Sequence, residues 1–98
     1  MKQIAYNFSS KIWQHQSPGG WFFVSLPEHH SKEIRNLLGD LEEGWGRLKA
    51  QAQIEDTKWE TAIWFDTKHK TYILPLKAAI RKQLQLEAGQ TVKITIFV

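Results

Sequence analysis

The sequence contains no cysteine, and this absence excludes several kinds of site at once. Without a thiol there is no disulfide, no thiolate metal site and no cysteine nucleophile. No apolar run approaches the roughly 20 residues of a membrane-spanning helix, and the first ten residues lack the hydrophobic stretch of a secretory signal. We therefore expect a soluble, cytoplasmic protein. A length of 98 residues is typical of one domain with a small core, spanning residues 1–98.

The motifs of common enzyme classes are also missing. The chain has no Gly-x-Ser-x-Gly motif and no glycine-rich loop that ends in Gly-Lys-Ser or Gly-Lys-Thr. Its four histidines include the adjacent His29 and His30, which lack the i, i+4 spacing of a metal-binding helix. The carboxylates near predicted turns do not form the buried pair that general acid–base chemistry uses. The sequence predicts no metal, no cofactor and no enzymatic activity.

Acidic residues are scarce in the last third of the chain. Residues 1–66 carry a net charge of −2, whereas residues 67–98 carry +5. Between positions 67 and 86 there are five cations and no carboxylate: Lys68, Lys70, Lys77, Arg81 and Lys82. Such a stretch can bind an anion or nucleic acid, and it can equally be a solvated face without a partner.

What the sequence does contain is alternation between apolar and polar residues, which is typical of half-buried strands. The predicted strands are 3–13, 21–26, 47–55, 59–65, 71–74 and 91–98, with a turn at 17–20. Two short helices are expected. Ser31 caps the first, which ends at Gly39, and Pro75 opens the second, which covers residues 76–86. Many strands with two short helices indicate a small, mainly β barrel.

Two stretches of the chain echo each other, one around Leu26-Pro27 and one around Leu74-Pro75. When Ile34-Arg35 is aligned with Ile80-Arg81, Leu38 matches Leu84, and the first copy has two extra residues. Each copy is a strand, a short amphipathic helix and an alternating strand. Two such units can pair about a pseudo-twofold axis and close one barrel with few open edges.

Three longer segments carry a resemblance to a known family. They are GGWFFVSLP, GWGRLKAQAQIEDTKWETAIWF and YILPLKAAIRKQLQLEAGQTVKITI. The Trp59-Glu60-Thr61 triplet, the stretch from Tyr72 to Lys77, Arg81 and Gly89 are the more specific parts. In order and over most of its length, the chain resembles the DUF1905 family, whose function is unknown. The resemblance implies a double-split β-barrel, a fold shared with the AbrB/MazE group of DNA-binding proteins.

The best candidate site combines cations with aromatic residues. Lys77 and Arg81 are four residues apart on the second helix, so they share a face. With Trp64 and Tyr72 they form a predicted site for an anionic small molecule or a protein partner. Trp64 is expected either to be exposed or to be covered by the helix 76–86. The alternative is an AbrB-like nucleic-acid surface that uses Lys68, Lys70, Lys77, Arg81 and Lys82. We expect a monomer or a weak dimer.

Overall fold

The computed structural model describes residues 3–16 and 19–98, and over these residues all seven strands form one antiparallel sheet. The strand order is β1-β7-β4-β5-β6-β3-β2. The strands are β1 (Ala5–Lys11), β2 (Trp13–Gln14), β3 (Phe22–Ser25), β4 (Arg47–Ile54), β5 (Thr57–Asp66), β6 (Thr71–Pro75) and β7 (Thr91–Phe97). The helices are α1 (Glu28–Leu38), η1 (Gly39–Leu41), η2 (Gly44–Gly46) and α2 (Ala78–Leu84). The mainly β class with two short α-helices is confirmed.

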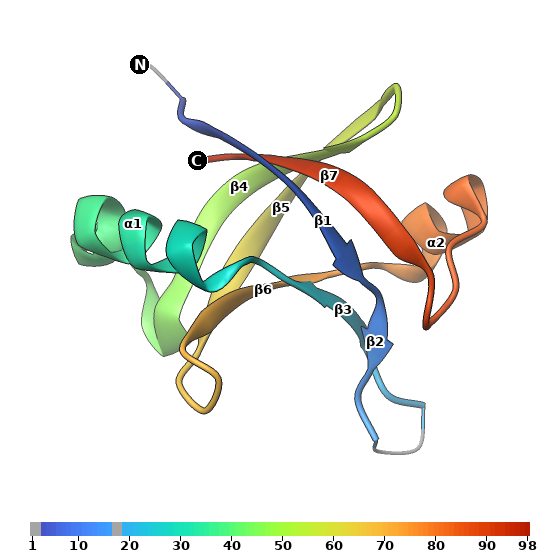
Figure 1. Cartoon of the computed structure of the whole chain (residues 1–98), viewed down its shortest axis with the longest axis horizontal. Coiled ribbons are helices and arrows are strands. Elements are labelled where there is room, and N and C mark those ends of the chain that lie inside the picture. The colour runs from blue at the N-terminus through green and yellow to red at the C-terminus, as the bar shows by residue number, and fades with distance from the viewer. Residues whose placement is uncertain (1–2, 17–18) are drawn as a thin grey trace.

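The sheet is strongly curled, and its two edges show why. β1 and β2 are the outermost strands, yet only Ile12 separates them in the chain. The two edges of the sheet must therefore approach each other, and Figure 1 shows the curl with α1 and α2 on opposite sides of it. Ile12 divides the single strand that was predicted over 3–13, because its N–H donates to the Gln90 carbonyl (2.9 Å) and its carbonyl accepts from Gly89 (2.8 Å).

The core fills the concave side of the sheet. The inward faces predicted for β4 and β7 are confirmed, because every second residue from Leu48 to Ile54 and from Val92 to Ile96 is buried. Trp59 packs against this core while remaining partly accessible. Ile4 was expected to point inward but is 37% exposed, because it lies just before β1 at the end of the sheet. Ser17 and Pro18 of the predicted turn lie outside the described residues.

Helix α1 begins earlier than predicted. Ser31 is not its cap, since the helix starts at Glu28 after Pro27, and the Ser31 N–H donates to the Pro27 carbonyl (3.0 Å). The Ser31 side chain is instead fully buried, and its hydroxyl accepts the backbone N–H of Tyr72 at 3.0 Å. The predicted end at Gly39 is confirmed, although Gly39 keeps right-handed dihedral angles.

Helix α2 is shorter than predicted and does not open at Pro75. That proline is the last residue of β6 and pairs with Phe23, and the helix cap is Lys77. A proline fits the end of a strand because its missing N–H is needed by no ladder bond there. The helix ends at Gln85 in the left-handed conformation, while Gly89 (φ +89°) forms the turn before β7.

The two echoing stretches are related by structure, but in a different register from the one predicted. Val24 pairs with Leu74 at the centre of the β3–β6 contact. The Leu26 N–H donates to the Tyr72 carbonyl (2.9 Å), and the Leu76 N–H donates to the Phe22 carbonyl (2.8 Å). Equivalent residues are therefore fifty apart, so Leu26 corresponds to Leu76. The caps Pro27 and Lys77 likewise match, with ψ values of 149° and 153°.

The alignment on the Ile-Arg pairs was therefore wrong. It needed two extra residues in the first copy, whereas the structure shows no insertion between strand and helix. In the observed register Ile34 corresponds to Leu84, and both lie against the core. Arg81 corresponds to the buried Ser31, so the two arginines of the echo are not equivalent.

Candidate binding surface

Two of the four predicted site residues, Lys77 and Arg81, line one surface hollow. It lies between the start of β3 and the start of α2, and its volume is about 230 Å³. The Arg81 N–H donates to the Lys77 carbonyl (3.0 Å), which places the two side chains on the same side of the first helical turn. Trp21 and Phe22 form the opposite wall. We call this hollow the cationic pocket.

The Arg81 side chain is held in place on both sides. Its Nε donates to the Leu76 carbonyl at 3.1 Å, and its guanidinium carbon lies 3.9 Å from the centroid of the Phe22 ring. A guanidinium stacks well on an aromatic face while its remaining N–H donors stay free. Among the described residues neither Arg81 nor Lys77 forms an ion pair with a carboxylate. The described lining of the pocket therefore presents positive charge without a carboxylate, and the acidic residue Glu87 belongs to the adjoining hollow that Arg81 and Lys82 share.

Trp64 lies in a neighbouring groove. This groove has a volume of about 370 Å³, and the described residues that line it are uncharged and mainly aromatic: Trp21, Phe23, Trp45, Trp64, Phe65, Ile73 and Pro75. We call it the aromatic groove. Trp64 is half-buried, and the Arg47 guanidinium carbon lies 5.9 Å from its ring centroid. Its predicted position on the outward face of its strand is confirmed, since its neighbour Ile63 is fully buried. The neighbours of Trp64 in the groove come from strands, from η2 and, in Trp21, from the residue just before β3, and among the described residues none of α2 lines it.

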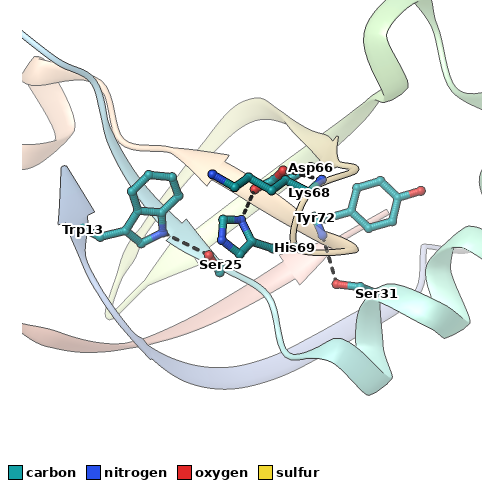
Figure 2. Close-up of polar contacts among 7 residues, drawn as sticks. All are labelled: Trp13, Ser25, Ser31, Asp66, Lys68, His69 and Tyr72. Carbon is teal, nitrogen blue, oxygen red and sulfur yellow. Dashed lines mark hydrogen bonds and ion pairs between the residues drawn. The ribbon is translucent and has the colours of Figure 1, made fainter. Parts of the chain in front are cut away.

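Tyr72 lines neither hollow, so the structure does not bring it together with the other three predicted site residues. The residue is fully buried, because it shares the inward face of β6 with Leu74. Its hydroxyl donates to Glu42. Its backbone N–H donates to the Ser31 hydroxyl, as Figure 2 shows. Burial, followed by the hydrogen bond and the negative charge of Glu42, raises the pKa of Tyr72 far above its ordinary value. The tyrosine therefore stays neutral and structural.

The five cations between positions 67 and 86 do not form one patch. Lys70 lines a separate hollow beside α1, together with Lys32 and Arg35. Lys77 and Arg81 lie at the other end of β6, and Lys82 extends from them along α2. A strand rises about 3.3 Å per residue, so the seven steps from Lys70 to Lys77 separate these groups by roughly 20 Å. The single basic surface predicted over residues 68–82 is thus divided in two.

Lys68 lies in the β5–β6 turn, which Asp66 organises. The Asp66 carboxylate accepts the Lys68 backbone N–H at 3.0 Å and contacts the His69 Nδ1 at 2.7 Å (Figure 2). Burial raises the pKa of Asp66, but the bonds from His69 and the backbone outweigh this and leave the pKa below its usual value. The carboxylate is thereby fixed within the turn. Over the described residues no group of three or more His, Asp or Glu side chains can hold a metal ion.

Two exposed tryptophans were missed by the sequence reasoning. Trp21 is 64% exposed and lines both the cationic pocket and the aromatic groove, while Trp45 is 92% exposed at the rim of the groove. Trp45 has φ +67°, a left-handed conformation that costs a bulky residue about 1–3 kcal/mol. The sequence did indicate that these two positions are exposed, because Trp21 follows Gly20 and Trp45 lies between Gly44 and Gly46. Glycines are typical of turns and loops, which lie at the surface.

Gly46 makes the position of Trp45 possible. It has φ +73°, and a Cβ atom there would lie 3.0 Å from the Cβ of Phe65. The glycine therefore lets the loop approach β5 closely, while Trp45 points outward. A second stacked arginine lies on the other side of Phe65, where the Arg35 guanidinium carbon is 3.7 Å from the ring centroid and its Nε is 3.7 Å from Glu42.

Comparison with known proteins gives a family and no activity. A family model described as "Domain of unknown function (DUF1905)" matches residues 8–96 of the 98. No curated protein matches the chain. Among the described residues, none of the helices is both long and apolar enough to cross a bilayer. The family match covers nearly the whole chain, including both hollows, and the chain therefore belongs to the DUF1905 family.

Proposed function

We propose that this chain is a non-enzymatic binding domain that takes an anionic small molecule, or an anionic group of a partner, in the cationic pocket. The observation that carries the proposal is the arrangement of Arg81. Its guanidinium is stacked on Phe22 and hydrogen-bonded to the Leu76 carbonyl, with Lys77 beside it and no carboxylate among the described residues that line the pocket.

This arrangement favours binding for a physical reason. An arginine that is already held in one conformation loses little side-chain entropy when an anion arrives. Its planar fork of donors matches a carboxylate or phosphate, whereas the flexible lysine adds a point charge. The half-buried position of Arg81 also weakens screening by salt, which strengthens the attraction.

The lining of the two hollows supports binding over catalysis. Among the described residues that line them, none is a carboxylate, a histidine or a hydroxyl-bearing side chain. General acid–base and nucleophilic mechanisms need such a group within hydrogen-bond reach of the substrate. Lys77 and Arg81 are the charged side chains among these residues, and both are suited to holding an anion.

A more specific assignment of the fold is compatible with a small binding domain. We infer that the curled sheet is a double-split β-barrel in which two strand-helix-strand units meet at β3 and β6. The fifty-residue correspondence between the units, without an insertion, supports this inference. AbrB-like proteins with this fold bind DNA, but a shared fold does not carry a function with it.

The test uses the whole chain and two simple anions. Inorganic phosphate and citrate are titrated into the ¹⁵N-labelled protein at constant ionic strength, with chloride as the replaced ion. We expect amide shifts at residues 20–22 and 76–82. Lys77→Ala with Arg81→Ala should weaken the affinity at least tenfold, because a charge-assisted hydrogen bond contributes about 1.5–3 kcal/mol.

The matched control removes the same charge elsewhere. Lys49→Ala with Lys93→Ala deletes two exposed lysines that line neither hollow, and this variant should bind as the wild type does. Equal loss in both double variants would reduce the effect to net charge and overturn the proposal, as would phosphate and citrate shifts that ignore Arg81.

The nucleic-acid alternative is tested with mixed-sequence single-stranded and double-stranded oligonucleotides at low salt. It requires an affinity whose logarithm falls linearly with the logarithm of the salt concentration. It further requires Lys68→Ala and Lys70→Ala to weaken binding as much as Lys77→Ala does. A flat salt dependence, or no binding at low salt, would remove it.

A further inference from the structure

The aromatic groove and the cationic pocket share one wall. Trp21 lines both hollows and is 64% exposed, so a molecule lying across it reaches both. The described residues of one hollow supply flat aromatic faces and no charged side chain, and the other hollow supplies the cations Lys77 and Arg81. The two chemistries are thus adjacent and separate, with a single tryptophan between them.

The groove is built on the outward face of the sheet, where strand register brings aromatic residues into rows. Phe23 pairs with Trp13 on one side and with Pro75 on the other, and the Trp13 and Phe23 ring centroids are 4.9 Å apart. Trp64 pairs with Ile73 on the next strand. Strand pairing thus positions Phe23 and Trp64, whereas Phe65, which also lines the groove, packs against the core beside Tyr72.

Trp45 adds a third indole at the rim. It is 92% exposed and is held in a left-handed conformation that a tryptophan rarely adopts. Neither burial nor backbone preference explains why an indole stands there. A flat ligand in the groove explains it, because an indole face gains stacking contacts only when a ring covers it.

We propose that the two hollows form one composite site for a planar aromatic ring tethered to an anionic group, with nucleoside monophosphates as the representative class. The ring stacks in the aromatic groove on Trp64 and Trp45, and the phosphate reaches past Trp21 to Lys77 and Arg81. The inference rests on the proposed function, since it uses the same two cations, and it adds the ring. A purely apolar ligand would leave the cations unused, and an anion without a ring would leave the aromatic groove empty.

The experiment compares a whole ligand with its two parts. AMP, adenosine and ribose 5-phosphate are each titrated into the intact chain at constant ionic strength, with affinities from calorimetry or amide shifts. AMP should bind about tenfold or more tightly than either part, as expected when both stacking and charge pairing contribute. Trp45→Gly should lower the affinity for AMP toward that for ribose 5-phosphate, and Arg81→Ala should lower it toward that for adenosine.

Trp45→Gly is the preferred groove variant, because Trp45 is almost fully exposed and glycine accepts its backbone conformation. Trp64→Ala is the second groove variant, with its folding checked by thermal unfolding. Leu41→Ala is the matched control, since Leu41 is 68% exposed and lines neither hollow. It should leave the affinity for AMP unchanged.

The outcomes separate this inference from the proposed function. If ribose 5-phosphate binds as tightly as AMP and Trp45→Gly has no effect, the composite site is refuted while the anion site stands. If none of the three compounds binds and phosphate also fails, both are refuted. A 5′-phosphorylated oligoadenylate tests whether the ligand is a free nucleotide or the 5′ end of a nucleic-acid strand. Tighter binding than AMP identifies the strand end as the ligand, and equal binding identifies the free nucleotide.

Discussion

The buried hydroxyl of Ser31 is predicted to be the most costly polar side chain to remove from α1. It is fully buried, and its oxygen accepts the Tyr72 backbone N–H at 3.0 Å (Figure 2). In Ser31→Ala this N–H has no acceptor in the interior. An unsatisfied buried donor costs about 1–3 kcal/mol, and the higher helix propensity of alanine returns up to about 0.5 kcal/mol.

The expected net loss for Ser31→Ala is therefore about 0.5–2.5 kcal/mol in the free energy of unfolding. For a domain of 98 residues, each kcal/mol lowers Tm by about 4–8 °C. Urea unfolding followed by tryptophan fluorescence measures the loss, and the midpoint should fall while the slope of the transition stays constant. Hydrogen exchange of the Tyr72 amide gives a local readout, because that N–H should exchange faster in the variant.

Ser9→Ala is the matched control, since Ser9 is an exposed serine on β1, and we expect a change within about 0.5 kcal/mol. If Ser31→Ala unfolds with the same midpoint as Ser9→Ala, and the Tyr72 amide remains protected, the Ser31 hydroxyl is not what satisfies this amide. The account of how α1 is joined to β6 would then be refuted.

Two further predictions concern turns. Because the pKa of Asp66 is lowered in the folded chain, its charge stabilises the fold above the unfolded-state pKa, and this contribution disappears as the pH falls through the folded-state value. Asp66→Asn should thus lower the free energy of unfolding at pH 7 by up to about 1 kcal/mol. In urea titrations, the difference in this free energy between variant and wild type should shrink below about pH 4. A difference that stays constant to pH 2 would contradict this account. Gly46→Ala should cost about 1–2 kcal/mol, because φ is +73° and the new Cβ would lie 3.0 Å from the Cβ of Phe65. Gly44→Ala, where no atom lies within 4 Å and φ is not positive, is its control, and equal midpoints for the two would refute the steric argument.

Alternation made the strands predictable, and its limits explain the errors in the helices. In β4 the buried and accessible residues follow the apolar and polar letters one by one. Ser31, by contrast, has the residue type of a helix cap, and only the tertiary contact with Tyr72 shows that it is a buried acceptor. Local preference for capping was overridden by a backbone donor 41 residues away.

The candidate site was half predictable for a related reason. Lys77 and Arg81 meet because four residues of one helical turn separate them. Tyr72 was grouped with them by its nearness in sequence, although its alternation with Leu74 places it on the inward face of β6. Trp21 reaches the pocket through the pairing of β3 with β6, and a single sequence does not display that pairing.

The fifty-residue correspondence assigns different tasks to one position in the two halves of the chain. In the first half that position is Ser31, a buried residue whose hydroxyl accepts the backbone N–H of Tyr72 and so joins α1 to β6. In the second half it is Arg81, which lies over Phe22 and faces a hollow. One position of the repeat thus serves interior packing in the first half and, under the proposed function, anion binding in the second.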